Sequence, residues 1–112
     1  MIDYNNKIFR SLNTSKNGEV NSDTVFYYRQ NKNIVTAIYS GGNILSGQLI
    51  AIADANGVLN MHYHHINSSN EPKSGKCIST PEILENGKIR LLEKWQWTSG
   101  DNSTGESVVE EI

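Results

Sequence analysis

Residues 88–98 read Lys-Ile-Arg-Leu-Leu-Glu-Lys-Trp-Gln-Trp-Thr, and this stretch decides the fold. Its side chains alternate between two faces, which is the pattern of a half-buried β-strand. One face is mostly charged and polar. The other face carries Ile89, Leu91, Glu93, Trp95 and Trp97. We therefore expect a strand whose tryptophan-bearing face points into the protein.

Seven further segments have the composition of strands, and clusters of turn residues separate them. β-Branched and aromatic side chains dominate residues 24–29 and 33–39, for example. Asn and Gly gather between the segments, as at 54–57, because they tolerate the left-handed backbone of tight turns. No segment keeps an apolar helical period over three turns. The expected strands are 7–13, 24–29, 33–39, 44–53, 58–66, 76–80, 88–98 and 104–111.

Short strands at near-regular spacing predict an all-β fold, built as an antiparallel up-and-down meander of about eight strands. The chain has 112 residues, the usual length of one domain, so we expect residues 1–112 to form a single domain. Such a meander closes into a small barrel when its first and last strands meet, and closure removes exposed edges. The sequence leaves a barrel and a sandwich open, and we favour the closed barrel.

The hairpin around Asp54-Ala55-Asn56-Gly57 allows two registers. A type I turn with Gly57 as a bulge pairs Leu49 with Tyr63 and Ala51 with Met61, whereas a two-residue loop pairs Ile50 with Met61. We favour the first register, whose small side chains would leave room opposite the two tryptophans. The inward face would then hold Leu45, Gly47, Leu49, Ala51, Ala53, Leu59, Met61, Tyr63 and His65.

Composition argues against several classes of protein. Lys and Arg number 10 and Asp and Glu number 12, so the net charge is −2, without the basic excess of a nucleic-acid binder. A mean hydropathy of −0.50 argues against a membrane protein. The first residues lack the features of a signal peptide, so we expect a cytoplasmic location. Cys77 is the sole cysteine, and we expect it to be a small buried hydrophobic side chain.

A carboxylate on an apolar face makes Glu93 the first candidate for a functional residue. It would either anchor a polar group of a ligand or form a buried ion pair, for which Arg29 is the expected partner. Trp95 and Trp97 would either belong to the core or line a ligand cavity. The candidate ligand-binding residues are Glu93, Trp95, Trp97, Arg29, Tyr63 and His65.

Motifs for metals and cofactors are not evident in the sequence. His62 and His64 share one face of a strand, but a zinc site needs three or four ligands, so we expect no metal. The turn at Gly41-Gly42 lacks the following helix and the lysine of a phosphate-binding loop. We therefore expect no cofactor.

Two stretches resemble a small bacterial family of one-domain proteins. They are residues 39–50, with Tyr39-Ser40-Gly41-Gly42 and Gly47-Gln48-Leu49-Ile50, and residues 87–101, with Glu93-Lys94-Trp95-Gln96-Trp97. The likeness covers essentially the whole chain, and residues 81–101 are its most specific part. Genomes often label this family N-acetylglutamate synthase, which would imply acetyl transfer from acetyl-coenzyme A. The resemblance carries no catalytic residue over to this chain.

The sequence lacks the loop that acetyltransferases of the usual fold place at a helix N-terminus to hold the coenzyme A pyrophosphate. In architecture the expected barrel is similar to the lipocalin and avidin type, a likeness of fold that carries no function by itself. Three functions remain. We rank first the binding of a small amphipathic or aromatic ligand in the barrel interior. The alternatives are an enzyme that uses Glu93 beside a His or Arg, and an assembly module such as a homodimer.

Overall fold

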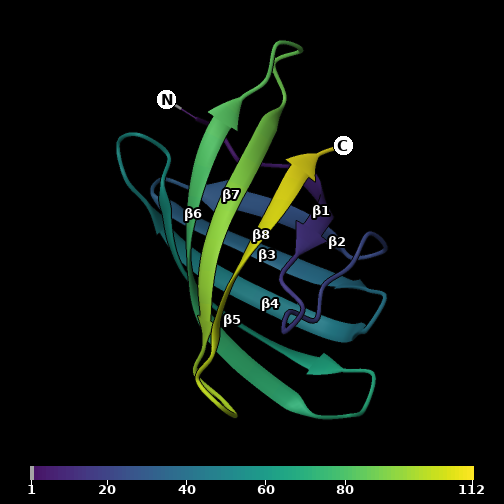
Figure 1. Cartoon of the computed structure of the whole chain (residues 1–112). Helices are drawn as coiled ribbons and strands as arrows, with labels where there is room; N and C mark the ends of the chain where they lie inside the picture. The colour runs from purple at the N-terminus through teal and green to yellow at the C-terminus, as the bar shows by residue number, and fades with distance from the viewer. Residues whose placement is uncertain (1) are drawn as a thin grey trace.

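A computed structural model describes residues 2–112 as a closed barrel of eight antiparallel strands (Figure 1). The strands follow one another as a meander, and the last strand pairs with the first. They are β1 (Ile8–Thr14), β2 (Val25–Asn31), β3 (Ile34–Gly41), β4 (Ile44–Ala53), β5 (Leu59–Asn67), β6 (Pro72–Ile83), β7 (Ile89–Trp97) and β8 (Thr104–Glu111). The predicted all-β meander and its closure into a barrel are confirmed. Residues 2–112 contain no helix able to span a membrane.

The largest difference from the predicted strands is in β6. The sequence predicts a strand over 76–80 only, but β6 begins at Pro72 and ends at Ile83. A proline is tolerated near each end of β6, because its backbone has no N–H group to donate and neither position requires one for pairing. Pro72 is the first residue of the strand. Pro81 pairs with β7 alone, because the pairing of β6 with β5 has already ended at Ser79.

The hairpin of β4 and β5 has the favoured register. Leu49 pairs with Tyr63 and Ala51 pairs with Met61, and Gly57 adopts a φ of +81° in the turn. Such a positive φ is open to glycine without steric cost, which explains why the turn carries Gly at this position. The prediction of the type I turn with a glycine bulge therefore identified the correct faces for most of this hairpin.

One residue of that predicted inward face is wrong. Leu45 is exposed, and its neighbour Ile44 is buried instead. The cause is a bulge in β4 between Ile44 and Ser46, which adds a residue against β5 and reverses the alternation of side chains. The inward and outward faces predicted by counting back from Leu49 are therefore wrong before Ser46, because the pattern of apolar residues does not reveal a bulge.

The two ends of the barrel are filled differently. At one end the N-terminal segment covers the opening, where Tyr4 is fully buried and donates a hydrogen bond to the carbonyl of Gly57. Packed side chains fill the adjoining half of the barrel, including Phe9, Tyr28, Val35, Leu59, Leu91 and Val109. The other end, which we call the mouth, is covered by the loop of residues 15–24 between β1 and β2 (Figure 1).

Three inward aromatic rings lie against glycines of a neighbouring strand. A Cβ atom added at any of these glycines would overlap the ring. The rings therefore lie along the barrel wall rather than across its centre. The predicted room opposite the tryptophans is accordingly not left by Gly47, because the ring of Tyr39 occupies that place. The cross-strand pairs are Tyr39 with Gly47, Tyr63 with Gly75, and Trp95 with Gly105.

Candidate functional site

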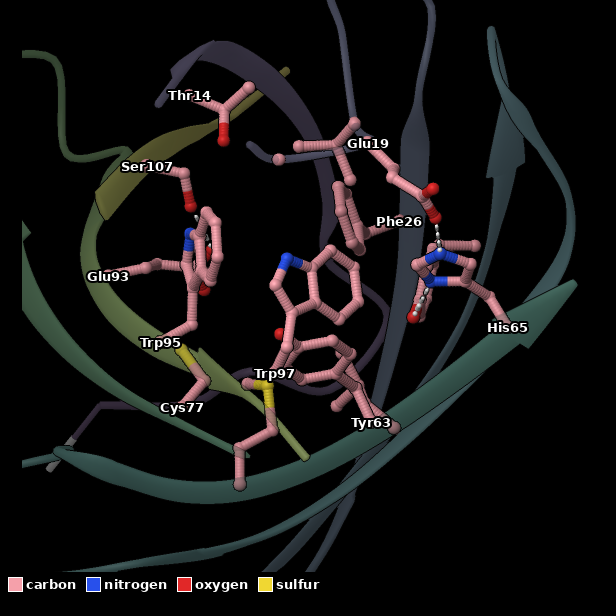
Figure 2. A pocket seen from close by; sticks show the side chains of 15 residues that line it. Thr14, Glu19, Phe26, Tyr63, His65, Cys77, Glu93, Trp95, Trp97 and Ser107 are labelled. Atoms are coloured by element: carbon pink, nitrogen blue, oxygen red, sulfur yellow. Dashed lines mark hydrogen bonds and ion pairs between the residues drawn. The ribbon is translucent and has the colours of Figure 1, made fainter. Parts of the chain in front are cut away.

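A cavity occupies the mouth half of the barrel, beneath the loop of residues 15–24 (Figure 2). About 60 Å³ of it is open to the centre of a water molecule. Each of the eight strands contributes to its walls, and Gly18, Glu19 and Val20 of the loop cover it. The wall residues are Thr14, Phe26, Tyr39, Leu49, Met61, Tyr63, His65, Cys77, Glu93, Trp95, Trp97 and Ser107.

One wall of the cavity is a cluster of aromatic rings. The ring centroids of Trp95 and Trp97 are 5.5 Å apart, and those of Trp97 and Tyr63 are 5.8 Å apart, both in edge-to-face geometry. The indole Nε1 of Trp97 donates a 3.0 Å hydrogen bond to the carbonyl of Asn17 in the covering loop. This bond fixes the indole ring of Trp97 against the loop.

The carboxylate of Glu93 forms the polar part of the site. Its two oxygens accept hydrogen bonds from the hydroxyls of Ser79, at 2.6 Å, and Ser107, at 3.1 Å. The three residues lie side by side on β6, β7 and β8, because Glu93 pairs directly with both serines. Burial raises the pKa of Glu93 above its ordinary value, although the two hydrogen bonds oppose this effect. The side chain is only half-buried, because it faces the cavity.

On the opposite side of the cavity, His65 joins β5 to the covering loop (Figure 2). Its Nε2 donates to Glu19 at 2.7 Å, and its Nδ1 accepts from the hydroxyl of Tyr39 at 2.9 Å. Burial lowers the pKa of His65 more than Glu19 raises it, so the imidazole is neutral near pH 7. Burial alone would raise the pKa of Glu19, but hydrogen bonds from His65 and Asn67 outweigh it and lower that pKa.

Comparison with models of protein families matches residues 2–112 to the family described as avidin-like protein. The chain belongs to this family. Searches of curated proteins and of solved structures gave no match. The match spans all the strands of the barrel, so the avidin-type architecture expected from the sequence is correct.

The avidin-like barrel brings five of the six candidate residues to one cavity: Glu93, Trp95, Trp97, Tyr63 and His65. The sixth, Arg29, is exposed on the outer surface, so the predicted ion pair with Glu93 is wrong. The reason is the alternation of β2, where Phe26 and Tyr28 are buried and the next residue must point outward. That signal is present in the sequence, since both rings precede Arg29 by odd numbers of residues.

Five polar residues of the site were not predicted from the sequence, namely Thr14, Glu19, Tyr39, Ser79 and Ser107. Ser79 and Ser107 could be found from the register, because both lie beside Glu93 on neighbouring strands. Tyr39 likewise faces inward by alternation. Glu19 has no comparable signal, because its position over the cavity depends on the path of a loop.

Three other side chains singled out from the sequence are Cys77, His62 and His64. Cys77 is buried in the wall, and burial raises the pKa of its thiol, so it is an unreactive apolar side chain as expected. His62 and His64 share the exposed outer face of β5, as the alternation predicts. Within residues 2–112, no group of three His, Cys, Asp or Glu side chains could hold a metal ion.

Proposed function

We propose that this avidin-like barrel binds a small organic molecule in the cavity beneath its mouth. The observation that carries the proposal is the arrangement of Glu93 with its two serines against a wall of aromatic rings. Binding cavities combine apolar walls with a few placed polar groups, whereas a core has no need of a carboxylate that faces empty space. Eight-stranded barrels of this kind have room for one small ligand.

The enzyme interpretation has less support. It requires a His or Arg within hydrogen-bond reach of Glu93, but the partners found for its carboxylate among residues 2–112 are two serine hydroxyls. The buried histidine of the site, His65, is engaged by Glu19 and Tyr39. Nor do residues 2–112 offer a helix N-terminus for a coenzyme A pyrophosphate. We therefore do not propose acetyl transfer.

Native mass spectrometry of protein purified gently from its own host tests the proposal. A retained small molecule is the expected result. The variant Cys77→Phe should abolish retention, because the larger side chain fills the cavity, while Ile78→Phe should leave it unchanged, because Ile78 is the outward neighbour on the same strand. Circular dichroism confirms that both variants fold. Equal retention by both variants, or no bound molecule in the native protein, contradicts the proposal.

A second candidate function is self-association through the outer face of the barrel. Large apolar side chains on β2, β3 and β4 are 45% to 62% exposed there, and no acidic residue interrupts them. They are Tyr27, Ile34, Ile38, Ile50 and Ile52. Strands β2 to β4 give a footprint of about 14 by 26 Å, or roughly 370 Å² before side-chain relief, which is about half of the ~800 Å² per partner of a standard interface. We propose a second copy of this chain as the occupant, because an apolar face is self-complementary, and Arg29 is the one charged side chain on the outward face of β2, β3 and β4.

Sedimentation velocity over a range of concentrations tests this second candidate. The native chain should form a dimer, and the double variant Ile38→Lys, Ile50→Lys should be monomeric, because two charges would be buried in the interface. Leu92→Lys is the matched control, since Leu92 is an exposed apolar residue on β7. A monomeric native chain at every concentration, or dissociation by the control variant as well, overturns the candidate.

A further inference from the structure

The charges that line the cavity are of one sign. Its walls and cover contain two carboxylates, Glu93 and Glu19, and no Lys or Arg among residues 2–112. Glu19 already has hydrogen-bond donors, from His65 and Asn67. Glu93 has neither a cation within ion-pair distance in the described chain nor a donor other than two neutral hydroxyls. The carboxylate of Glu93 therefore has no opposite charge next to it in the cavity.

Glu93 also retains unused capacity for hydrogen bonds. A carboxylate has about four acceptor positions, and the two serine hydroxyls occupy one on each oxygen. Since the side chain faces the cavity, its remaining positions are available to a molecule there. Hydrogen bonds between a carboxylate and a charged N–H donor are about twice as strong as neutral ones. A ligand that carries such donors would gain most from this wall.

The remaining walls favour a cation over a neutral donor. Trp95, Trp97 and Tyr63 surround the space next to Glu93 (Figure 2), and the faces of such rings attract positive charge. The volume limits the group to a compact one, because 60 Å³ open to water centres holds roughly four to six water molecules. A planar amidinium or guanidinium, or a short alkylammonium, has a comparable number of atoms.

We infer that the ligand of this cavity is a compact organic cation with N–H groups, which donates to Glu93 and packs against Trp95 and Trp97. The inference rests on the proposed binding function and names the chemical class that the cavity selects. An anionic group would meet Glu93 without a compensating cation in the walls, and a neutral amide would leave the charge of Glu93 unpaired.

The raised pKa of Glu93 agrees with this assignment. Burial disfavours the ionised carboxylate in the empty cavity, and the two serine hydroxyls offset this only in part. A bound cation would supply the missing opposite charge and lower the pKa of Glu93 again. The ionised carboxylate thus lacks a counter-charge in the empty cavity, and the ligand would provide that charge when it binds.

Three isosteric probes test the inference: acetamidinium, acetamide and acetate. They share one planar shape of a size that the cavity accepts, and differ in charge. The chain has two tryptophans, and both line the cavity, so their two indole N–H signals report binding directly in an NMR titration. We expect acetamidinium to bind about ten-fold more tightly than acetamide, as a charge-assisted hydrogen bond would give, and acetate not to bind.

Two charge-matched variants complete the experiment. Glu93→Gln keeps the shape of the side chain and should reduce the preference for acetamidinium over acetamide to about one-fold, because the charge is lost. Glu106→Gln makes the same change on an exposed residue of β8 and should keep the full preference. If both variants keep the preference, the cation is held by something other than Glu93, and the inference is overturned.

The remaining outcomes separate this inference from the proposed function. Acetamide or acetate that binds as tightly as acetamidinium overturns the inference but supports a binding cavity. Biotin, which streptavidin barrels bind, is a further probe. Saturable binding of biotin without binding of acetamidinium likewise overturns the inference but supports a binding cavity. If no probe shifts the indole signals, the cation inference fails, while native mass spectrometry decides independently whether the cavity binds any molecule.

Discussion

The imidazole of His65 and the carboxylate of Glu19 meet at 2.7 Å, so a side chain near the end of β5 holds the loop that covers the cavity. The same carboxylate accepts a second hydrogen bond from Asn67 at 2.9 Å. Trp97 contacts the loop from the other side through the carbonyl of Asn17. Ser15 and Asn17 of the loop also form hydrogen bonds to β8. A molecule that enters from the mouth must therefore pass a loop that is held to β5, β7 and β8.

Loosening the loop should accelerate exchange at the mouth. In Glu19→Ala both hydrogen bonds to the carboxylate are lost, and loss of bonds to a charged group should speed local opening by about ten-fold or more. Hydrogen–deuterium exchange of residues 16–22 measures the effect. The exposed Glu85, in the turn at the opposite end of the barrel, provides the control as Glu85→Ala. Equal exchange in the two variants would show that the loop is held by other contacts.

Acid should destabilise the fold through His65 and then Glu19. Since burial lowers the pKa of His65 in the folded state, the unfolded chain binds more protons, and stability falls as the pH drops below about 6.5. The lowered pKa of Glu19 extends the loss below its ordinary value of 4.5. Thermal unfolding between pH 8 and pH 4 measures this. His65→Asn should show a shallower dependence between pH 7 and pH 5, and an unchanged slope contradicts the assignment.

Glu93 should have the opposite dependence on pH. Its pKa is raised in the folded state, so its favourable contribution is present below pH 4.5 and is lost as the pH rises through the folded value. Glu93→Gln cannot ionise and should therefore gain stability relative to the native chain as the pH increases. Denaturant unfolding of both proteins at pH 4 and pH 8 tests this. A stability difference that is constant with pH would mean that the pKa of Glu93 is the same in the folded and unfolded chains.

Two adjacent leucines test the faces of β7. Leu91 is completely buried, and Leu91→Ala should lower the free energy of unfolding by about 2–5 kcal/mol, because it leaves a cavity in the core. Leu92 is 43% exposed, and Leu92→Ala should change stability by no more than about 0.5 kcal/mol. Urea unfolding distinguishes the two. Similar losses in both variants would contradict the alternation on which the site depends.

Most of the fold could be predicted from the sequence, because each strand carries its own alternation and each turn its own Gly or Asn. Closure of the barrel was expected from the meander, but the register of that closure could not be predicted, since β1 and β8 pair with a shift between Ser11 and Asn13. Such a shift is a property of two distant strands together, and neither strand alone contains it. The face of Leu45 was predicted wrongly for the same reason, because the bulge in β4 appears only in its pairing with β5.

The site was predictable where a single strand determines it. Alternation along β7 places Glu93, Trp95 and Trp97 on one face, and the structure keeps them together. The partners of Glu93 were harder, because the sequence suggested a cation and the structure has two serine hydroxyls. A serine on an apolar face gives no distinct signal in a sequence, although its hydroxyl can donate a hydrogen bond to a buried carboxylate.

The pairs of aromatic rings and glycines also give a prediction. A methyl group at position 47 would displace the ring of Tyr39, so Gly47→Ala should destabilise the protein by about 1–3 kcal/mol. The loss should be smaller when Tyr39 is already replaced by alanine, because no ring then needs to move. A double-mutant cycle in urea measures the coupling. Additive losses would show that the glycine is required for another reason.

These glycines have a consequence for how related barrels can diversify. Positions 47, 75 and 105 set how far three rings extend into the lumen, yet each acts by having no side chain. A side chain as small as that of alanine or serine at one of these positions would displace the ring inward and leave a smaller cavity. Cavity size can therefore change by single substitutions at these glycines, while Glu93 and its serine partners stay the same.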